Sequence, residues 1–233
     1  MRKRNKRQLY VMIFVFTMIA LAYTCRMLDM YDIGSGYPGD VRAALYILLL
    51  ALWGYSIDRR IIQKPVLHCL RLTDALMLLW LILRTLKYEV VTDLTVARYL
   101  WYLYYLPMLF IPLLGVYIAM SLGKSEEYRL SGKTQLLTII PALLFLCVIT
   151  NDLHQKVFTF KSGIPGNPGN GPYYHNVLYF FCLAWMVGCM IFTVVHIFKN
   201  SRVSNVGKRR VMPFVFCCVT ILYGVLDLIG IPQ

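Results

Sequence analysis

The sequence is divided into apolar blocks, most of them long enough to cross a bilayer, that are separated by short polar connections. The hydrocarbon core of a bilayer is about 30 Å thick, and a helix needs ~20 apolar residues to cross it. Lipid also forces a spanning segment to satisfy its own backbone N–H and C=O groups, which favours helices. The alternating segments of about ten residues that a β-barrel would need are absent. The pattern predicts an all-α fold, a polytopic α-helical membrane bundle of about seven transmembrane helices in a single domain, residues 1–233.

The predicted spans have approximate bounds of residues 9–30, 41–55, 67–86, 98–121, 136–149, 177–198 and 211–229. The first span is too long for the core of a cleavable signal peptide, and no small-residue cleavage site follows it. The last span ends on Gly230-Ile231-Pro232, a sequence that normally turns into another element. We therefore expect the chain to be the front part of a longer protein or a truncated paralogue.

The formal net charge of +13 alone would fit a nucleic-acid-binding protein. The lysines and arginines, however, gather in short clusters between the apolar blocks, which is a signal of membrane topology. Residues 1–8 and residues 199–210 each hold five basic residues and no acid. We predict a multi-pass protein of the cell membrane with a cytoplasmic N-terminus (residues 1–8), an external loop at residues 151–176, and no nucleic-acid partner.

The start of this external loop carries the first candidate site. Asn151, Asp152 and His154 directly follow the fifth span. These side chains can cap a helix, bind a cation or hydrogen-bond a polar ligand. A metal site usually needs three or four ligands, and His175 would join them only if the loop folded back, so we expect no metal.

A run of aromatic residues in the fourth span carries the second candidate site. Trp101, Tyr104 and Tyr105 fall at helical spacing and can line one wall of an outward-facing cavity. They also fit an ordinary aromatic belt at headgroup depth. Pro107 and Pro112 would weaken the helix between them. Our hypothesis for a ligand-binding site therefore comprises Trp101, Tyr104, Tyr105, Asn151, Asp152 and His154.

Three charged residues lie near the membrane interior, where ionisable groups are costly and suggest function by default. Arg71 and Asp74 are three residues apart in the third span and can pair on one helix face, or can lie at the cytoplasmic headgroups. Asp227 lies close to the outer end of the last span, where solvation at the interface explains it.

No arrangement of residues indicates catalysis. Gly123-Lys124-Ser125 lacks the preceding glycine of a phosphate-binding loop, and no GxSxG or HExxH sequence is present. The seven cysteines lie in or beside apolar spans without CxxC spacing, as expected of small residues in helix packing. We expect neither enzyme activity nor a cofactor.

Three stretches, residues 101–124, 143–160 and 172–185, together resemble the N-terminal seven-transmembrane sensor region of bacterial histidine kinases. In that family a helix with aromatic residues and prolines and a Thr-Asn-x-Leu-His segment precede a variable external loop. The matching positions in this chain are Pro107, Pro112, Thr150, Asn151, Leu153 and His154. The likeness covers about residues 99–230, whereas the first three spans match in general character alone. It implies a two-component sensor, and it makes residues 163–172, rich in Gly and Pro, a variable tether.

We therefore predict a sensor domain that detects an extracellular or membrane cue and relays it to a cytoplasmic signalling output missing from this chain. Kinase activity is not implied, because the chain stops before such a module. The expected partners are the lipid bilayer, a small ligand and the output partner, and a homodimer is left open. The alternatives are a small multi-pass transporter, with flux dependent on Asp74 or Asp227, and a structural membrane protein that docks a partner through residues 199–210.

Overall fold

The computed structural model of the protein describes residues 17, 20, 21, 24, 37–60, 63–122, 124, 128, 130–160 and 173–200. Within these residues the chain is helical apart from two short strands. The first half comprises α2 (Tyr37–Arg60), α3 (Lys64–Thr85), the π-helical turn η1 (Leu86–Val90), α4 (Leu94–Leu103) and α5 (Tyr105–Ser121). The second half comprises α6 (Gly132–Gln135), the 3₁₀ turn η2 (Leu136–Thr138), α7 (Ile139–Ile149), α8 (Asn151–His154), β1 (Phe158–Phe160), β2 (Tyr173–His175) and α9 (Val177–Asn200).

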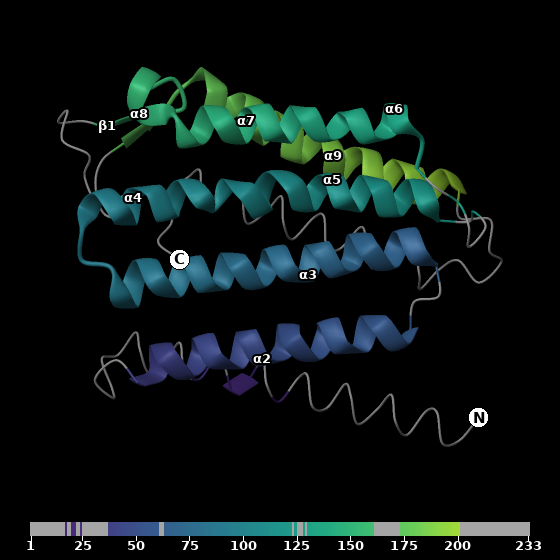
Figure 1. The fold of residues 1–233 in the computed structure, drawn as a ribbon, viewed down its shortest axis with the longest axis horizontal. Helices are drawn as coiled ribbons and strands as arrows, with labels where there is room; N and C mark the ends of the chain where they lie inside the picture. Colours follow the sequence, from purple (N-terminus) through teal and green to yellow (C-terminus); the bar gives the residue numbers. More distant parts are fainter. Residues whose placement is uncertain are drawn as a thin grey trace.

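The long helices lie side by side with nearly parallel axes and alternate in direction along the chain (Figure 1). α3 lies between α2 and α5, and α5 in turn contacts α7 and α9. One end of the bundle, called the hairpin end below, carries η1, the start of α4, α8 and the two strands. The opposite end carries the start of α3, the end of α5 and α6. The bundle is most enclosed around α5, where Leu109 and Leu113 are almost completely buried.

Within the described residues, four helical segments are long and apolar enough to cross a membrane: Lys64–Val90, Leu94–Ser121, Gly132–Ile149 and Val177–Lys199. They correspond to the third to sixth predicted spans, and the second corresponds to α2, whose apolar part is the shorter stretch Ala43–Ile57. The all-α membrane bundle is therefore confirmed. The predicted spans at residues 9–30 and 211–229 lie outside the described residues, apart from Thr17, Ala20, Leu21 and Thr24, which are helical.

Two predicted bounds at the hairpin end are wrong. The fourth span starts at Leu94 rather than near Arg98, because the Asp93 side chain accepts hydrogen bonds from the backbone N–H groups of Thr95 and Val96, both at 2.8 Å. The third span continues to Val90 through the π-helical turn. Lys87, which follows the predicted third span (residues 67–86), is buried in that turn with its ammonium 4.5 Å from the centre of the Tyr88 ring.

The prediction that Pro107 and Pro112 weaken the helix between them is wrong, because α5 is continuous from Tyr105 to Ser121 and the interruption lies just before it. Pro107 has no N–H to donate to the carbonyl of Leu103, and the regular helix is interrupted at Tyr104. There the backbone N–H of Tyr104 bonds the carbonyl of Trp101 at 3.1 Å, the tighter spacing of a 3₁₀ turn. Pro112 lies inside α5 without ending it. α4 and α5 thus form one span with a break after its first ten residues, counted from the hairpin end.

Polar contacts fasten α5 to its neighbours at the opposite end. The Tyr117 hydroxyl lies 3.1 Å from the carbonyl oxygen of Thr134 and 2.9 Å from the hydroxyl of Thr138. The amide of Gln63, just before α3, donates to the carbonyl of Ser121 at 2.9 Å. The end of α5 is therefore held both to the start of α3 and to the helical segment that leads into α7.

Gly54 of α2 faces Asp74 of α3. A Cβ atom at position 54 would lie 2.1 Å from the Oδ2 atom of Asp74, so that only glycine leaves room for the carboxyl group. The Oδ1 atom of Asp74 is buried and has no hydrogen-bond partner within the part of the chain that the structure describes. Asp74 is ten residues into α3, or about 15 Å along the helix from its start. A position of Asp74 at the cytoplasmic headgroups stays a prediction.

Candidate functional site

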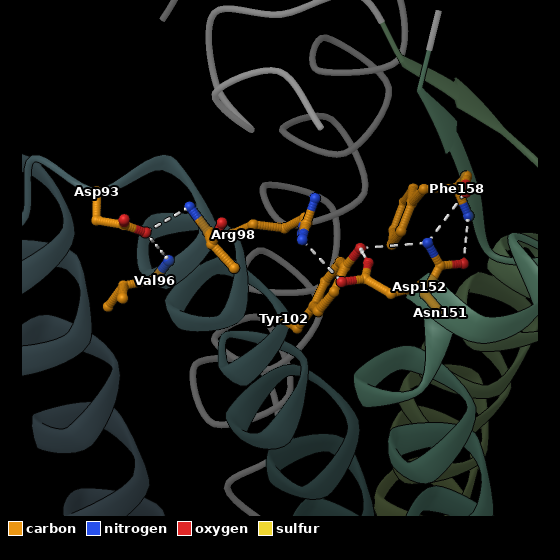
Figure 2. A network of polar contacts seen from close by, with 8 residues as sticks. Asp93, Val96, Arg98, Tyr102, Asn151, Asp152 and Phe158 are labelled. Atoms are coloured by element: carbon orange, nitrogen blue, oxygen red, sulfur yellow. Dashed lines mark hydrogen bonds and ion pairs between the residues drawn. The ribbon is translucent and has the colours of Figure 1, made fainter. Parts of the chain in front are cut away.

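A chain of polar contacts joins α4 to α8 at the hairpin end (Figure 2). The Nη2 group of Arg98 donates to the Oδ2 atom of Asp152 at 2.9 Å, and the Tyr102 hydroxyl donates to its Oδ1 atom at 2.8 Å. Arg98 and Tyr102 lie one turn apart on α4 and so point to the same neighbour. Arg98 and Tyr102 are buried, and the side chain of Asp152 is 24% exposed. We call Arg98, Tyr102, Asn151 and Asp152 the polar junction.

Asn151 extends this chain of contacts into the backbone of β1. Its Oδ1 atom accepts from the backbone N–H groups of Val157 and Phe158, both at 3.0 Å. Its Nδ2 group donates to the carbonyl of Phe158 at 3.0 Å and to the Tyr102 hydroxyl at 3.2 Å. All hydrogen-bonding capacity of the amide is used, which also fixes its orientation. Asn151 is fully buried and thereby sets the turn between α8 and β1.

His154 closes the end of α7 instead of facing outward. Its Nδ1 atom accepts from the backbone N–H of Lys156 at 2.9 Å, so the neutral ring carries its proton on Nε2. Nε2 then donates to the carbonyl of Cys147 at 3.0 Å. The next residue, Gln155, has a left-handed backbone with φ of 50°, and its N–H bonds the carbonyl of Asn151 at 2.7 Å. The possibility that these residues cap a helix is thus confirmed for His154.

The two described ends of the loop at residues 151–176 pair with each other. β1 pairs with β2 in antiparallel register, with Phe158 opposite His175 and Phe160 opposite Tyr173. Beyond the strands, the backbone N–H of Asn176 donates to the carbonyl of Val157 at 2.9 Å. Residues 161–172, which contain the predicted Gly- and Pro-rich tether, lie outside the described residues. The hairpin therefore connects α8 directly to the start of α9.

Phe158 is the centre of an aromatic cluster next to the polar junction. Its side chain is completely buried. Its ring contacts rings from α4, α5, β2 and α9, with centroid distances of 4.6 Å to Trp101, 5.6 Å to Tyr105, 5.8 Å to Tyr173 and 5.9 Å to Tyr179. Four elements that are distant in sequence therefore meet around one residue of β1.

The structure brings together most of the residues predicted to bind a ligand. Trp101 and Tyr105 flank Phe158, and Asn151 and Asp152 belong to the polar junction. Tyr104 is not among them, because it packs edge-on against Trp80 of α3 at 6.4 Å. The single wall expected from helical spacing is therefore not formed, and Phe158 fills the space between Trp101 and Tyr105.

Sequence reasoning missed three residues of this site, namely Arg98, Tyr102 and Phe158. A signal for the first two was present, since a basic residue within a span needs a partner. Arg98 and Tyr102 also share a helix face, and Asp152 is the acid that meets them. No sequence signal distinguishes Phe158 from the other aromatic residues. Among the described residues, no group of three or more His, Cys, Asp or Glu side chains could hold a metal ion.

A family model described as the N-terminal 7TM region of histidine kinase matches residues 41–232. The chain belongs to this family. The match begins well before residue 99 and therefore also includes the second and third spans. In the sequence, these two spans resemble the family in general character alone. No curated protein and no solved structure matches the chain.

Membership of the histidine kinase 7TM family assigns the chain to membrane signal transduction. This region is the sensor part of such kinases and is distinct from their catalytic module. A membrane location and a cytoplasmic signalling output follow from the family. No finding supports the alternative of a transporter.

Proposed function

We propose that this 7TM region detects an extracellular or membrane cue at the polar junction and relays it through α5 to a cytoplasmic output. The observation that carries the proposal is the buried ion pair between Arg98 and Asp152, which joins the start of α4 to α8. Buried ion pairs stabilise a fold weakly but respond strongly to the loss of one partner. A cue that changes this contact therefore changes how α4 and α8 pack against each other.

The distribution of charge supports an orientation with the hairpin end outside. Lys64, Lys133 and Lys199 lie at the opposite end, where the strongly basic residues 199–210 follow α9. Two basic residues of the hairpin end, Lys87 and Arg98, are buried in the bundle and are not free loop charges. The excess of Lys and Arg on the cytoplasmic side of membrane proteins favours this assignment.

The contacts of α5 support a relay between the two ends. The Trp185 indole of α9 donates to the carbonyl of Leu109 at 3.1 Å, near the middle of the span Leu94–Ser121 that α4 and α5 form. At the opposite end, Tyr117 is fastened to Thr134 and Ser121 to Gln63. A ligand can shift the arrangement of these helices only by the difference between its affinities for the two states. Closely packed helices transmit such a shift because their contacts are not continuously deformable.

Hydrogen–deuterium exchange on the complete chain in nanodiscs tests the relay. Asp152→Asn removes the charge of the ion pair at the hairpin end, and we expect faster exchange both locally and in residues 130–138 at the opposite end. Asp93→Asn is the matched control, because Asp93 caps α4 at the same end and asparagine caps equally well. Faster exchange confined to residues 94–105 and 150–160 in Asp152→Asn would show that no relay exists.

Alkaline phosphatase fusions test the orientation separately. A fusion within residues 161–172 is expected to be active outside the cell, and a fusion within residues 125–129 is expected to be inactive. The reverse pattern would place the polar junction on the cytoplasmic side and would contradict an extracellular cue.

A further inference from the structure

Arg98 is only partly satisfied by its surroundings. Its side chain is 7% exposed, and its Nη2 group is paired with Asp152. Its Nε and Nη1 groups are buried and have no hydrogen-bond partner among the residues that the structure describes. A guanidinium carries five N–H donors and no acceptor, so these two nitrogens leave several donors unused.

The neighbouring acid cannot supply the missing acceptors. One oxygen of Asp152 accepts from Arg98 and the other accepts from Tyr102, so the carboxylate binds the guanidinium through a single contact and not in a bidentate way. Leaving a buried donor unsatisfied costs more than a hydrogen bond gains, and more still for a charged group. Arg98 is therefore a cation that is poised to accept a second anionic partner.

Two aromatic rings flank the guanidinium. Its carbon lies 5.8 Å from the centre of the Tyr99 ring and 5.9 Å from that of the Phe160 ring. Aromatic rings stabilise the planar guanidinium group by cation–π contacts, which do not use its N–H donors. Tyr99 is exposed at the bundle surface, and Arg98 lies about 6 Å along α4 from Leu94, close to the end of the span.

We propose that Arg98 binds an oxyanion, a carboxylate or phosphate group, through its Nε and Nη1 groups. This inference rests on the proposed sensing function and names the chemical class of its cue. The oxyanion has two sources, a small soluble anion or the phosphate of an outer-leaflet phospholipid. Because both nitrogens are covered, binding selects the state in which Arg98 is uncovered, and the anion then competes with Asp152 for the same cation.

Calorimetric titration tests the soluble source. The complete chain, in a maltoside detergent without phospholipid, is titrated at constant ionic strength with sodium acetate and with inorganic phosphate. We expect saturable binding that Arg98→Gln weakens about tenfold or more and that Asp152→Asn, by removing a competing charge, strengthens about tenfold. Arg98→Lys keeps a charge for Asp152 but loses the other donors, and is expected to bind weakly while remaining folded. Arg84→Gln is the matched control, since Arg84 also lies over a tyrosine ring at the hairpin end but outside the junction.

Native mass spectrometry tests the lipid source with the same variants. If the phosphate belongs to a phospholipid, the wild-type chain and Arg84→Gln retain one phospholipid more than Arg98→Gln and Arg98→Lys. The inference is overturned if substitution of Arg98 changes neither anion binding nor phospholipid retention. That failure leaves the relay standing if Asp152→Asn still alters exchange at the opposite end, so the two proposals fail separately.

Discussion

Replacing Asn151 with alanine removes four hydrogen bonds from a completely buried site. The backbone N–H groups of Val157 and Phe158 lose their acceptor, and both residues are themselves 0% exposed. A buried donor without a partner costs about 1–3 kcal/mol, so the two together cost about 2–6 kcal/mol. We therefore expect Asn151→Ala to lower the free energy of unfolding by about that amount, a large share of the stability of a typical domain.

Asn176→Ala is the matched control for this prediction. The Asn176 amide donates to the carbonyl of Gln155 at 2.6 Å and to the Thr159 hydroxyl in the same hairpin, but this amide is partly exposed. Water can replace these contacts, so a loss of about 0.5–1.5 kcal/mol is expected. The assay is unfolding of the purified chain in mixed micelles titrated with sodium dodecyl sulfate and followed by circular dichroism. An Asn151→Ala variant that is destabilised no more than Asn176→Ala would refute the role assigned to Asn151.

Two further predictions concern the packing of the spans. Gly54→Ala should destabilise the chain by about 1–3 kcal/mol, because its Cβ would overlap Asp74, whereas Gly54→Ala combined with Asp74→Ala should recover most of that loss. Gly188→Ala is the control, since no atom of the described residues lies within 4 Å of the added Cβ. If Gly188→Ala also lowered the stability, the loss in Gly54→Ala would come from replacing a helical glycine and not from the overlap with Asp74. Trp185→Phe should cost about 0.5–1.5 kcal/mol by removing the hydrogen bond to Leu109, measured in the same titration, and no change would mean that this bond is not formed in the membrane.

The fold class could be predicted from the sequence because apolar length and charge clusters depend on the bilayer and not on tertiary detail. The third to sixth spans were placed within a few residues by that reasoning. The exact start of α4 could not be predicted, because it is set by the Asp93 side chain, which caps the helix and lies outside the apolar block. The hairpin was missed because three-residue strands carry too little alternation to be recognised.

The candidate site was predicted only in part, because the sequence shows local patterns and not contacts between helices. Asn151 and Asp152 stood out as polar residues at the end of a span, and both belong to the polar junction. Tyr104 was wrongly grouped with Trp101, since helical spacing assumes a regular helix and the helix is interrupted at Tyr104 itself. The pairing of Arg98 with Asp152 spans two different helices, and no local pattern reports such a contact.

The most direct test of the central claim, that the polar junction controls signalling, is the output of a reporter histidine kinase joined to the cytoplasmic side of this region in cells. A change of about 1.4 kcal/mol between two signalling states shifts their ratio tenfold. We expect Asp152→Asn to change basal phosphorylation by about that factor at normal membrane levels, and Asp93→Asn to leave it unchanged. Equal phosphorylation in the wild-type and Asp152→Asn proteins would contradict the account.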